Sequence, residues 1–172
     1  MMDIIEVPRC RNKWVMSGDS GVVKPNRIKP ILGAVIHHTA TFSDQSCINW
    51  FTSPQNKDSS AHYLVGLTGK VWQFVREDER AWHAGRSSLE INGTVYSSWN
   101  EFSLGYELTG NGNLKPYTDA QYESLGWLLA QAALKFNISK EFVVGHQQIC
   151  PLRKTDPGPL FDWTRLFPAT LR

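Results

Sequence analysis

The sequence predicts a single α/β domain in which a central β-sheet is flanked by α-helices and preceded by an irregular N-terminal arm. Three observations lead to this expectation. The chain has 172 residues, of which 41% are hydrophobic and 20% charged, enough for one core of ordinary size. Short apolar runs typical of strands alternate with segments of helical periodicity over residues 31–172. Residues 1–30 contain three prolines and little periodicity, as expected of an arm.

The composition excludes several classes of protein. Lys and Arg number 18 against 16 Asp and Glu, and a net charge of +2 is too weak for nucleic acid to be the main partner. No apolar run approaches the ~20 residues that cross a bilayer, so we expect no membrane insertion. The sequence therefore predicts a globular domain with some other kind of partner.

The cysteines and the first residues bear on the compartment. Cys10, Cys47 and Cys150 are odd in number and form no CxxC pair, which argues against a disulfide framework and a cysteine-based zinc finger. Residues 1–8 contain no basic segment followed by a long apolar stretch, so they do not resemble a secretory signal. We therefore expect a cytoplasmic chain made in a reducing environment, which leaves open where it acts.

The first half of the domain is predicted to contain three strands and a helix. Residues 31–36 form an apolar run typical of a buried strand, and polar residues follow it where α/β sheets usually bind ligands. A helix is expected over residues 45–53. The runs 63–67 and 71–75 flank a Thr-Gly-Lys turn and indicate a β-hairpin. Residues 84–100 are rich in Gly, Ser and Asn and predict a long surface loop.

The second half is predicted to contain two strands and a long helix. Residues 103–108 and 141–145 are strand-like, and residues 161–166 are expected to make one or two helical turns. Thr118, followed by Gln121 three positions later, indicates a capping box at the start of the long helix. The apolar residues that recur at helical spacing and predict its core-facing stripe are Tyr122, Leu125, Leu129, Ala132, Ala133 and Phe136.

Two of the five histidines occupy positions suited to a functional site. His37 and His146 each follow a strand-like run, so a rigid backbone can present the ring to a cleft. Prolines and a glycine surround Asp156 and indicate a stiff loop rather than a helix after His146. Two neutral imidazoles and one carboxylate suit a catalytic zinc ion, which leaves a fourth position for water. The spacing matches no short motif, and an ordinary, hydrogen-bonded histidine is the alternative at each position.

Two further residues have side chains suited to catalysis at such a site. Glu107 is a polar residue within a strand-like run, and it can exchange protons with a bound water if it faces the cleft. Lys154 lies two residues before Asp156, so the two side chains can face the same way in an extended loop. A lysine there can stabilise an oxyanion. The alternatives are a glutamate that points to solvent and an ordinary solvated lysine.

Other catalytic arrangements lack their motifs. The sequence contains no HExxH, GxSxG or GxxxxGK[ST] string, which disfavours metzincin-like, serine-hydrolase and P-loop mechanisms. Cys150 has a histidine nearby and is a candidate thiol nucleophile. A lone cysteine beside a proline is more often structural, so the thiol mechanism is the weaker alternative.

Several segments together resemble one enzyme family, the zinc-dependent N-acetylmuramoyl-L-alanine amidases. This group includes cytosolic anhydro-muropeptide amidases, phage lysozyme-type amidases and peptidoglycan recognition proteins. The segments occur in the family's order over about residues 31–165. They are 35–40 (VIHHTA), 60–65 (SAHYLV), 80–85 (RAWHAG), 103–108 (SLGYEL), 117–122 (YTDAQY), 144–146 (VGH) and 153–163 (RKTDPGPLFDW).

The resemblance implies a role for each of these candidate residues. His37, His146 and Asp156 are the implied zinc ligands, Glu107 the general base and Lys154 the residue that stabilises the oxyanion. The implied fold is a mixed β-sheet with helices on its faces, and the implied catalytic domain spans residues 31–172.

The resemblance also implies a substrate groove lined by His38, Trp82 and His83. An aspartate at position 156 is similar to the anhydro-muropeptide branch, because recognition proteins and some phage members have cysteine there. The pair His37-His38 is instead similar to many lytic members, because recycling amidases often have Asn after the first histidine. Both soluble muropeptides and intact peptidoglycan therefore stay open as substrates.

The expected reaction is hydrolysis of the amide between the lactyl group of N-acetylmuramic acid and L-alanine. Zinc is the expected cofactor, peptidoglycan or a muropeptide the expected partner, and a monomer the expected state. The alternative is a peptidoglycan-binding protein that has kept the fold and lost the activity. Retention of the implied ligands together with Glu107 and Lys154 counts against that alternative, because binding alone requires no activated water.

Overall fold

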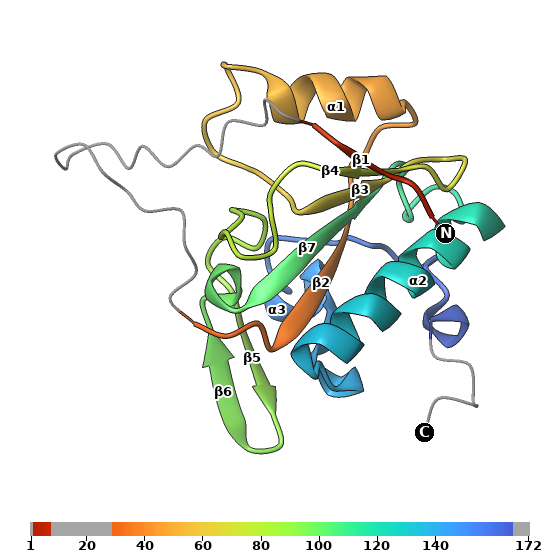
Figure 1. The fold of residues 1–172 in the computed structure, drawn as a ribbon. Helices are drawn as coiled ribbons and strands as arrows, with labels where there is room; N and C mark the ends of the chain where they lie inside the picture. The colour runs from red at the N-terminus through yellow and green to blue at the C-terminus, as the bar shows by residue number, and fades with distance from the viewer. Residues whose placement is uncertain (1, 8–28, 167–172) are drawn as a thin grey trace, which may run out of the picture.

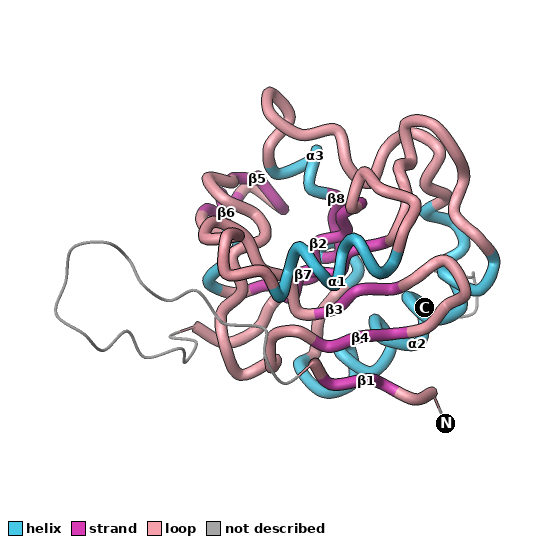
Figure 2. The backbone as a smooth tube through the Cα atoms, turned by 90° about the horizontal axis from the view of Figure 1, so that it is seen from above, coloured by secondary structure: helices cyan, strands magenta, loops and turns pink. Residues whose placement is uncertain are grey.

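Six strands form the main sheet, in the order β1-β4-β3-β7-β2-β8 (Figures 1 and 2). The structure is a computed structural model, and it describes residues 2–7 and 29–166. The strands of the main sheet are β1 (Ile4–Glu6), β2 (Gly33–His38), β3 (Tyr63–Val65), β4 (Val71–Gln73), β7 (Ser103–Leu108) and β8 (Val143–Gly145). The other elements are the strands β5 (Ser88–Ile91) and β6 (Thr94–Ser97) and the helices α1 (Asp44–Thr52), α2 (Asp119–Phe136) and α3 (His146–Ile149).

The main sheet is mixed, as predicted. β7 pairs in parallel with both β3 and β2, and β2 pairs in parallel with β8. β4 is antiparallel to β3 and confirms the predicted hairpin, whereas β1 pairs in parallel with β4 at the edge. The carboxyl ends of β2, β3, β7 and β8 therefore lie at one edge of the sheet, where parallel sheets bind ligands.

One face of the sheet packs against α2 and forms the largest apolar cluster. Successive side chains of a strand point to opposite faces, so every second residue of β2 and β7 faces this helix. The buried strand residues in this cluster are Ala34, Ile36, Tyr63, Val65, Val71, Leu104, Tyr106 and Leu108. The helix contributes Tyr122, Leu125, Leu128, Leu129 and Ala132. The predicted stripe is confirmed at Tyr122, Leu125, Leu129 and Ala132, and the partly buried Phe136 packs against the same cluster. The stripe also includes Leu128, whereas Ala133 is not part of the cluster.

The start of α2 is fixed to the strand ends. Thr118 is the N-cap, and its side chain and that of Gln121 form both bonds of the predicted capping box. The Gln121 amide also donates to the carbonyl oxygens of Val65 (3.3 Å) and Thr109 (2.8 Å), at the ends of β3 and β7. These bonds give the buried Gln121 amide its own partners and tie the first turn of α2 to the ends of the two strands.

The opposite face is covered by α1, by α3 and by the hairpin of β5 and β6. Figures 1 and 2 place α1 and α2 on opposite sides of the sheet. Phe51 of α1 packs with Leu64 of β3, whereas Ile91 of β5 packs with Val35 of β2. Because residues alternate along β2, His37 points to the same face as Val35, away from α2.

Three segments differ from the sequence-based expectation. Residues 4–6 were expected in an irregular arm and form β1, a three-residue strand too short for periodicity to reveal. The predicted loop over residues 84–100 contains the β5–β6 hairpin, whose Asn-Gly turn at residues 92 and 93 has positive φ at both positions. Residues 147–149, expected in a stiff loop, belong to the single helical turn α3.

The other predicted elements are confirmed with shifted ends. α1 begins one residue earlier than expected, after the N-cap Ser43, and the tail forms a 3₁₀ turn over Trp163–Arg165. Residues 8–28 of the predicted arm lie outside the described residues, so the boundary at residue 30 stays a prediction. Within residues 2–7 and 29–166, no helix is long and apolar enough to cross a membrane.

Two leucines of α2 provide a test of the packing. Leu125 is fully buried, whereas Leu134 is 83% exposed on the same helix. We expect Leu125→Ala to lower the free energy of unfolding by about 2–5 kcal/mol, because it leaves a cavity in the core. Leu134→Ala, with the same change in helix propensity, should alter it by less than about 0.5 kcal/mol. Urea unfolding measures both values, and equal losses would contradict this packing.

Candidate metal centre and active site

A cavity of about 600 Å³ opens at the carboxyl ends of the parallel strands. His37 comes from β2, His146 is the first residue of α3 directly after β8, and Asp156 lies in the loop that follows α3. The residues that line the cavity include His37, His38, Thr41, Trp50, Ser60, His83, Glu107, His146, Arg153, Lys154 and Asp156. The fold therefore brings segments far apart in the sequence to one place.

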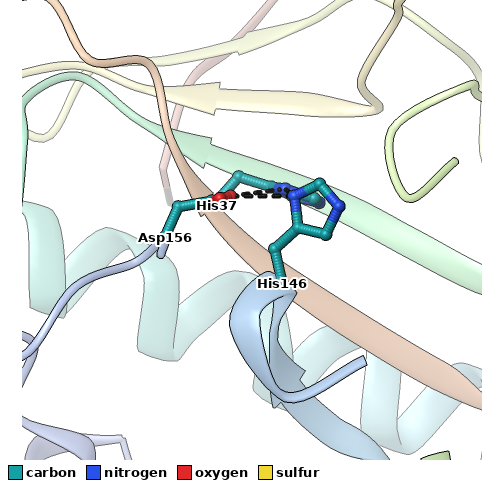
Figure 3. Close-up of side chains that lie close together, drawn as sticks. All are labelled: His37, His146 and Asp156. Atoms are coloured by element: carbon teal, nitrogen blue, oxygen red, sulfur yellow. Dashed lines mark hydrogen bonds and ion pairs between the residues drawn. The ribbon is translucent and has the colours of Figure 1, made fainter. Parts of the chain in front are cut away.

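His37, His146 and Asp156 converge on a single point (Figure 3). The Nδ1 atoms of the two histidines are 2.9 Å apart. The Asp156 Oδ2 atom lies 3.0 Å from each of these nitrogens. All three residues are buried. Three ligand atoms this close together fit around one ion at the usual distances of about 2.0–2.2 Å.

The charges of the three side chains suit a cation. Burial, only partly offset by the hydrogen bond to Asp156, lowers the pKa of His37 to about 4, so its imidazole is neutral near pH 7. Burial alone would raise the pKa of Asp156, but its contacts with His146 and His37 hold it well below its ordinary value. Two imidazoles and a carboxylate thus form a group that could hold a metal ion.

The loop that carries Asp156 is fixed by backbone contacts. The Gln147 amide donates to the Asp156 carbonyl oxygen at 2.9 Å, and the Tyr117 hydroxyl donates to that of Pro157 at 2.7 Å. Gly112 packs directly against this loop, because a Cβ atom built on it would lie 1.9 Å from the Pro157 carbonyl oxygen. The position of Asp156 therefore depends on the absence of a side chain at residue 112.

Glu107 lies beside His37 and faces the same cavity. The two residues are register partners in the parallel pair of β2 and β7, so their side chains point to the same face. The Glu107 Oε2 atom is buried and has no hydrogen-bond partner within the described residues. Burial, together with the negative charge of Asp156, raises the pKa of Glu107 to about 8, although Lys154 opposes the shift. A carboxyl group with this pKa can both take up and release protons near neutral pH.

Lys154 lines the cavity two residues before Asp156, as the sequence suggested. Its positive charge lowers the pKa of both His37 and Glu107. Within the described part of the chain, the amine forms no ion pair. It is therefore available to a negative charge in the cavity.

The three residues that were expected to line a substrate groove are distributed over two cavities. His38 lines the main cavity, Trp82 lines a smaller adjoining cavity of about 190 Å³, and His83 lines both. The Arg80 guanidinium stacks on the Trp82 ring at 4.1 Å from its centroid. His38 is half-buried, but His83 is only 9% exposed and contacts His37 directly.

Two residues near the site were missed from the sequence. Trp50 is 54% exposed at the rim of the cavity, and its place on α1 gave no sign of this. Asn100 is buried and accepts hydrogen bonds from the backbone amides of His83 (3.1 Å) and Ala84 (2.7 Å). An asparagine between Trp99 and Phe102 was a possible signal, because a polar residue in an apolar segment usually has a buried partner.

Cys150 has the environment of a structural cysteine. Its thiol is buried, and the carbonyl oxygens of Arg86 (2.9 Å) and Ala84 (3.5 Å) are the acceptors within reach of its one proton. Burial raises its pKa, although Arg153 opposes the shift. A thiol nucleophile needs a lowered pKa, so the thiol mechanism is disfavoured.

Comparison with known families assigns the chain to one of them. The family described as N-acetylmuramoyl-L-alanine amidase matches residues 27–159, more than half of the sequence. This chain belongs to the N-acetylmuramoyl-L-alanine amidase family. The resemblance first seen in the separate sequence segments is thereby confirmed.

Individual relatives agree with the family assignment. The chain is 43% identical over 106 residues to the 1,6-anhydro-N-acetylmuramyl-L-alanine amidase AmpD of Citrobacter freundii, a match that covers 62% of this chain and 54% of the relative. The chain thus spans about half the length of this curated amidase.

Solved structures of amidases have the same fold. A crystal structure of a selenomethionine derivative of AmpD superposes with a TM-score of 0.63 and 30% identity, covering 80% of this chain and 83% of the other. AmiD from E. coli, in complex with the substrate anhydro-N-acetylmuramic acid-L-Ala-D-γ-Glu-L-Lys, superposes with a TM-score of 0.68 and 36% identity over 79% and 56% of the two chains. These likenesses confirm the predicted fold class.

Two glycine substitutions test how the Asp156 loop of this amidase-family chain is held. Gly112→Ala should weaken metal binding by at least ~10-fold, because the added methyl group displaces the loop that carries Asp156. Gly126→Ala on α2 is the matched control, because no atom lies within 4 Å of the added Cβ. Competition with a chromophoric chelator measures metal affinity. Unchanged affinity in Gly112→Ala would contradict the contact described here.

Proposed function

We propose that this chain is a zinc-dependent amidase that hydrolyses the bond between the lactyl group of N-acetylmuramic acid and L-alanine. The observation that carries the proposal is the convergence of His37, His146 and Asp156 beside the unpartnered carboxylate oxygen of Glu107. A site for binding alone needs no metal-suited triad next to a proton acceptor. Membership of the amidase family supports the same reaction.

Each catalytic side chain has a defined part in the proposed reaction. A zinc ion held by the three ligands would make a bound water more acidic and polarise the amide carbonyl. Glu107 takes a proton from the attacking water and returns it to the departing L-alanine nitrogen. Lys154 stabilises the negative charge that develops on the carbonyl oxygen, and loss of one such donor typically costs about 3–4 kcal/mol.

The names of the relatives support muropeptides as substrates. The Citrobacter freundii enzyme is named for a 1,6-anhydro-N-acetylmuramyl-L-alanine substrate, and the AmiD structure contains an anhydro-muropeptide. The 600 Å³ cavity is large enough for several residues of such a molecule. We therefore propose anhydro-muropeptides as substrates, with intact peptidoglycan as the alternative to be compared.

Removal of the metal is the first test. The purified chain should release peptides with a free L-alanine amino terminus from anhydro-muropeptides, because the reaction breaks the bond to that nitrogen. A chelator should abolish the release, and added zinc should restore it. Mass spectrometry of the products measures both steps, and parallel assays on intact sacculi compare the two substrates. A zinc-loaded chain that binds muropeptides without releasing peptide would instead support a recognition protein.

The role of Glu107 has a separate test. Glu107→Ala should retain zinc while turnover falls by roughly 10²–10⁴-fold, the usual contribution of a positioned acid and base. Metal content and kcat are measured on the same preparation. Glu123→Ala, at an exposed position on α2, is the control and should leave both unchanged. Parallel loss of zinc and turnover in Glu107→Ala would assign Glu107 to metal binding.

A further inference from the structure

His37 and His146 each contact residue 83 or 84 through Nε2, the ring nitrogen that does not face Asp156. The His146 Nε2 atom lies 3.2 Å from the Ala84 carbonyl oxygen. The His37 Nε2 atom lies 3.0 Å from the Nδ1 atom of His83. Two adjacent residues therefore contact the two rings on the side opposite the Nδ1 atoms.

The contact with Ala84 settles which nitrogen of His146 carries the proton. A carbonyl oxygen only accepts hydrogen bonds, so Nε2 must be the donor. A neutral His146 then has no proton on Nδ1, and its lone pair faces His37 and Asp156. This tautomer is the one that can bind an ion at Nδ1.

A longer chain of hydrogen bonds has the same effect on His37. The Ser103 hydroxyl donates its only proton to the Trp99 carbonyl oxygen at 2.5 Å. Its oxygen can therefore only accept from the His83 Nε2 atom, 3.4 Å away. A neutral His83 protonated on Nε2 has an unprotonated Nδ1, which accepts from His37 Nε2. The lone pair of His37 Nδ1 is thereby left facing the other ligands.

Other contacts fix the backbone and the ring of His83. Asn100 accepts from the amides of both His83 and Ala84, so one side chain positions both supports. Gly105 of β7 leaves the room that the His83 ring occupies, because a Cβ atom built there would lie 2.5 Å from His83 Cγ. The buried position of His83 also limits the surface that it can offer to a substrate.

We propose that His83 and Asn100 are positioning residues that set the tautomers of the two histidine ligands. The Trp99 carbonyl sets the tautomer of His37 through Ser103 and His83, and the Ala84 carbonyl sets that of His146 directly. Both Nδ1 atoms then present lone pairs to one ion. The inference rests on the metal site of the proposed function, but not on which amide is cleaved, and it assigns His83 a role other than contact with the substrate.

Two substitutions at residue 83 separate positioning from packing. His83→Leu keeps a branched side chain of similar width and removes the acceptor. His83→Asn places an amide oxygen where Nδ1 lies, so it can still accept from His37. We expect the zinc dissociation constant to rise 10–100-fold in His83→Leu and to return to within a few-fold of the native value in His83→Asn. Chelator competition measures the affinity without any turnover.

The outcomes distinguish the possible roles of His83. Equal losses of affinity in both variants would assign it to packing, and unchanged zinc affinity with a raised KM would assign it to substrate contact. Either result overturns the proposal. A native chain that binds no zinc would contradict the proposed function itself, which is a separate failure.

A measurement on the native chain covers the case in which the variants do not fold. Nitrogen-15 chemical shifts of the zinc-loaded protein report which ring nitrogen of each histidine is protonated. We expect His83, His37 and His146 all to carry the proton on Nε2. A proton on Nδ1 of His83 would reverse the hydrogen bond to His37 and overturn the proposal.

Discussion

The mutual repulsion of three lone pairs is the constraint on which the site depends. The Nδ1 atoms of His37 and His146 and an oxygen of Asp156 are 2.9–3.0 Å apart in a buried place. Such atoms are stable together only when a proton or a cation lies among them. The scaffold keeps them there through two parallel strands that end at one edge and a loop anchored to its neighbours. The fold therefore holds these atoms together in a site that attracts positive charge.

Burial shifts the pKa values of neighbouring groups in opposite directions. It disfavours the charged form of each, so it lowers the pKa of His37 and raises that of Glu107. Asp156 differs because its contacts with both histidines hold its pKa below the ordinary value despite its burial. The carboxylate of Asp156, in the loop after α3, is therefore held in its charged form, while burial raises the pKa of Glu107 to about 8. The parallel register of β2 and β7 places Glu107 beside His37.

The sequence predicted those parts of the site that follow from local patterns. His37 and His146 stand directly after apolar runs, so their places at strand ends could be predicted. Asp156 could be connected with them only through the stiff loop and the family resemblance. The roles of His83 and Asn100 could not be predicted, because they depend on contacts between segments that only the folded chain brings together. β1 was missed for a related reason, since three residues carry no periodicity.

The alternation of side chains along β2 also protects the site against a misfolded form. The two adjacent histidines point to opposite faces, so a strand that slipped by one residue would bring His38 into the place of His37. The same slip would move His37 into the place of Ile36, against the apolar residues of α2. A buried imidazole without a partner there would cost several kcal/mol. The apolar core thus selects which histidine of the pair lies beside His146 and Asp156.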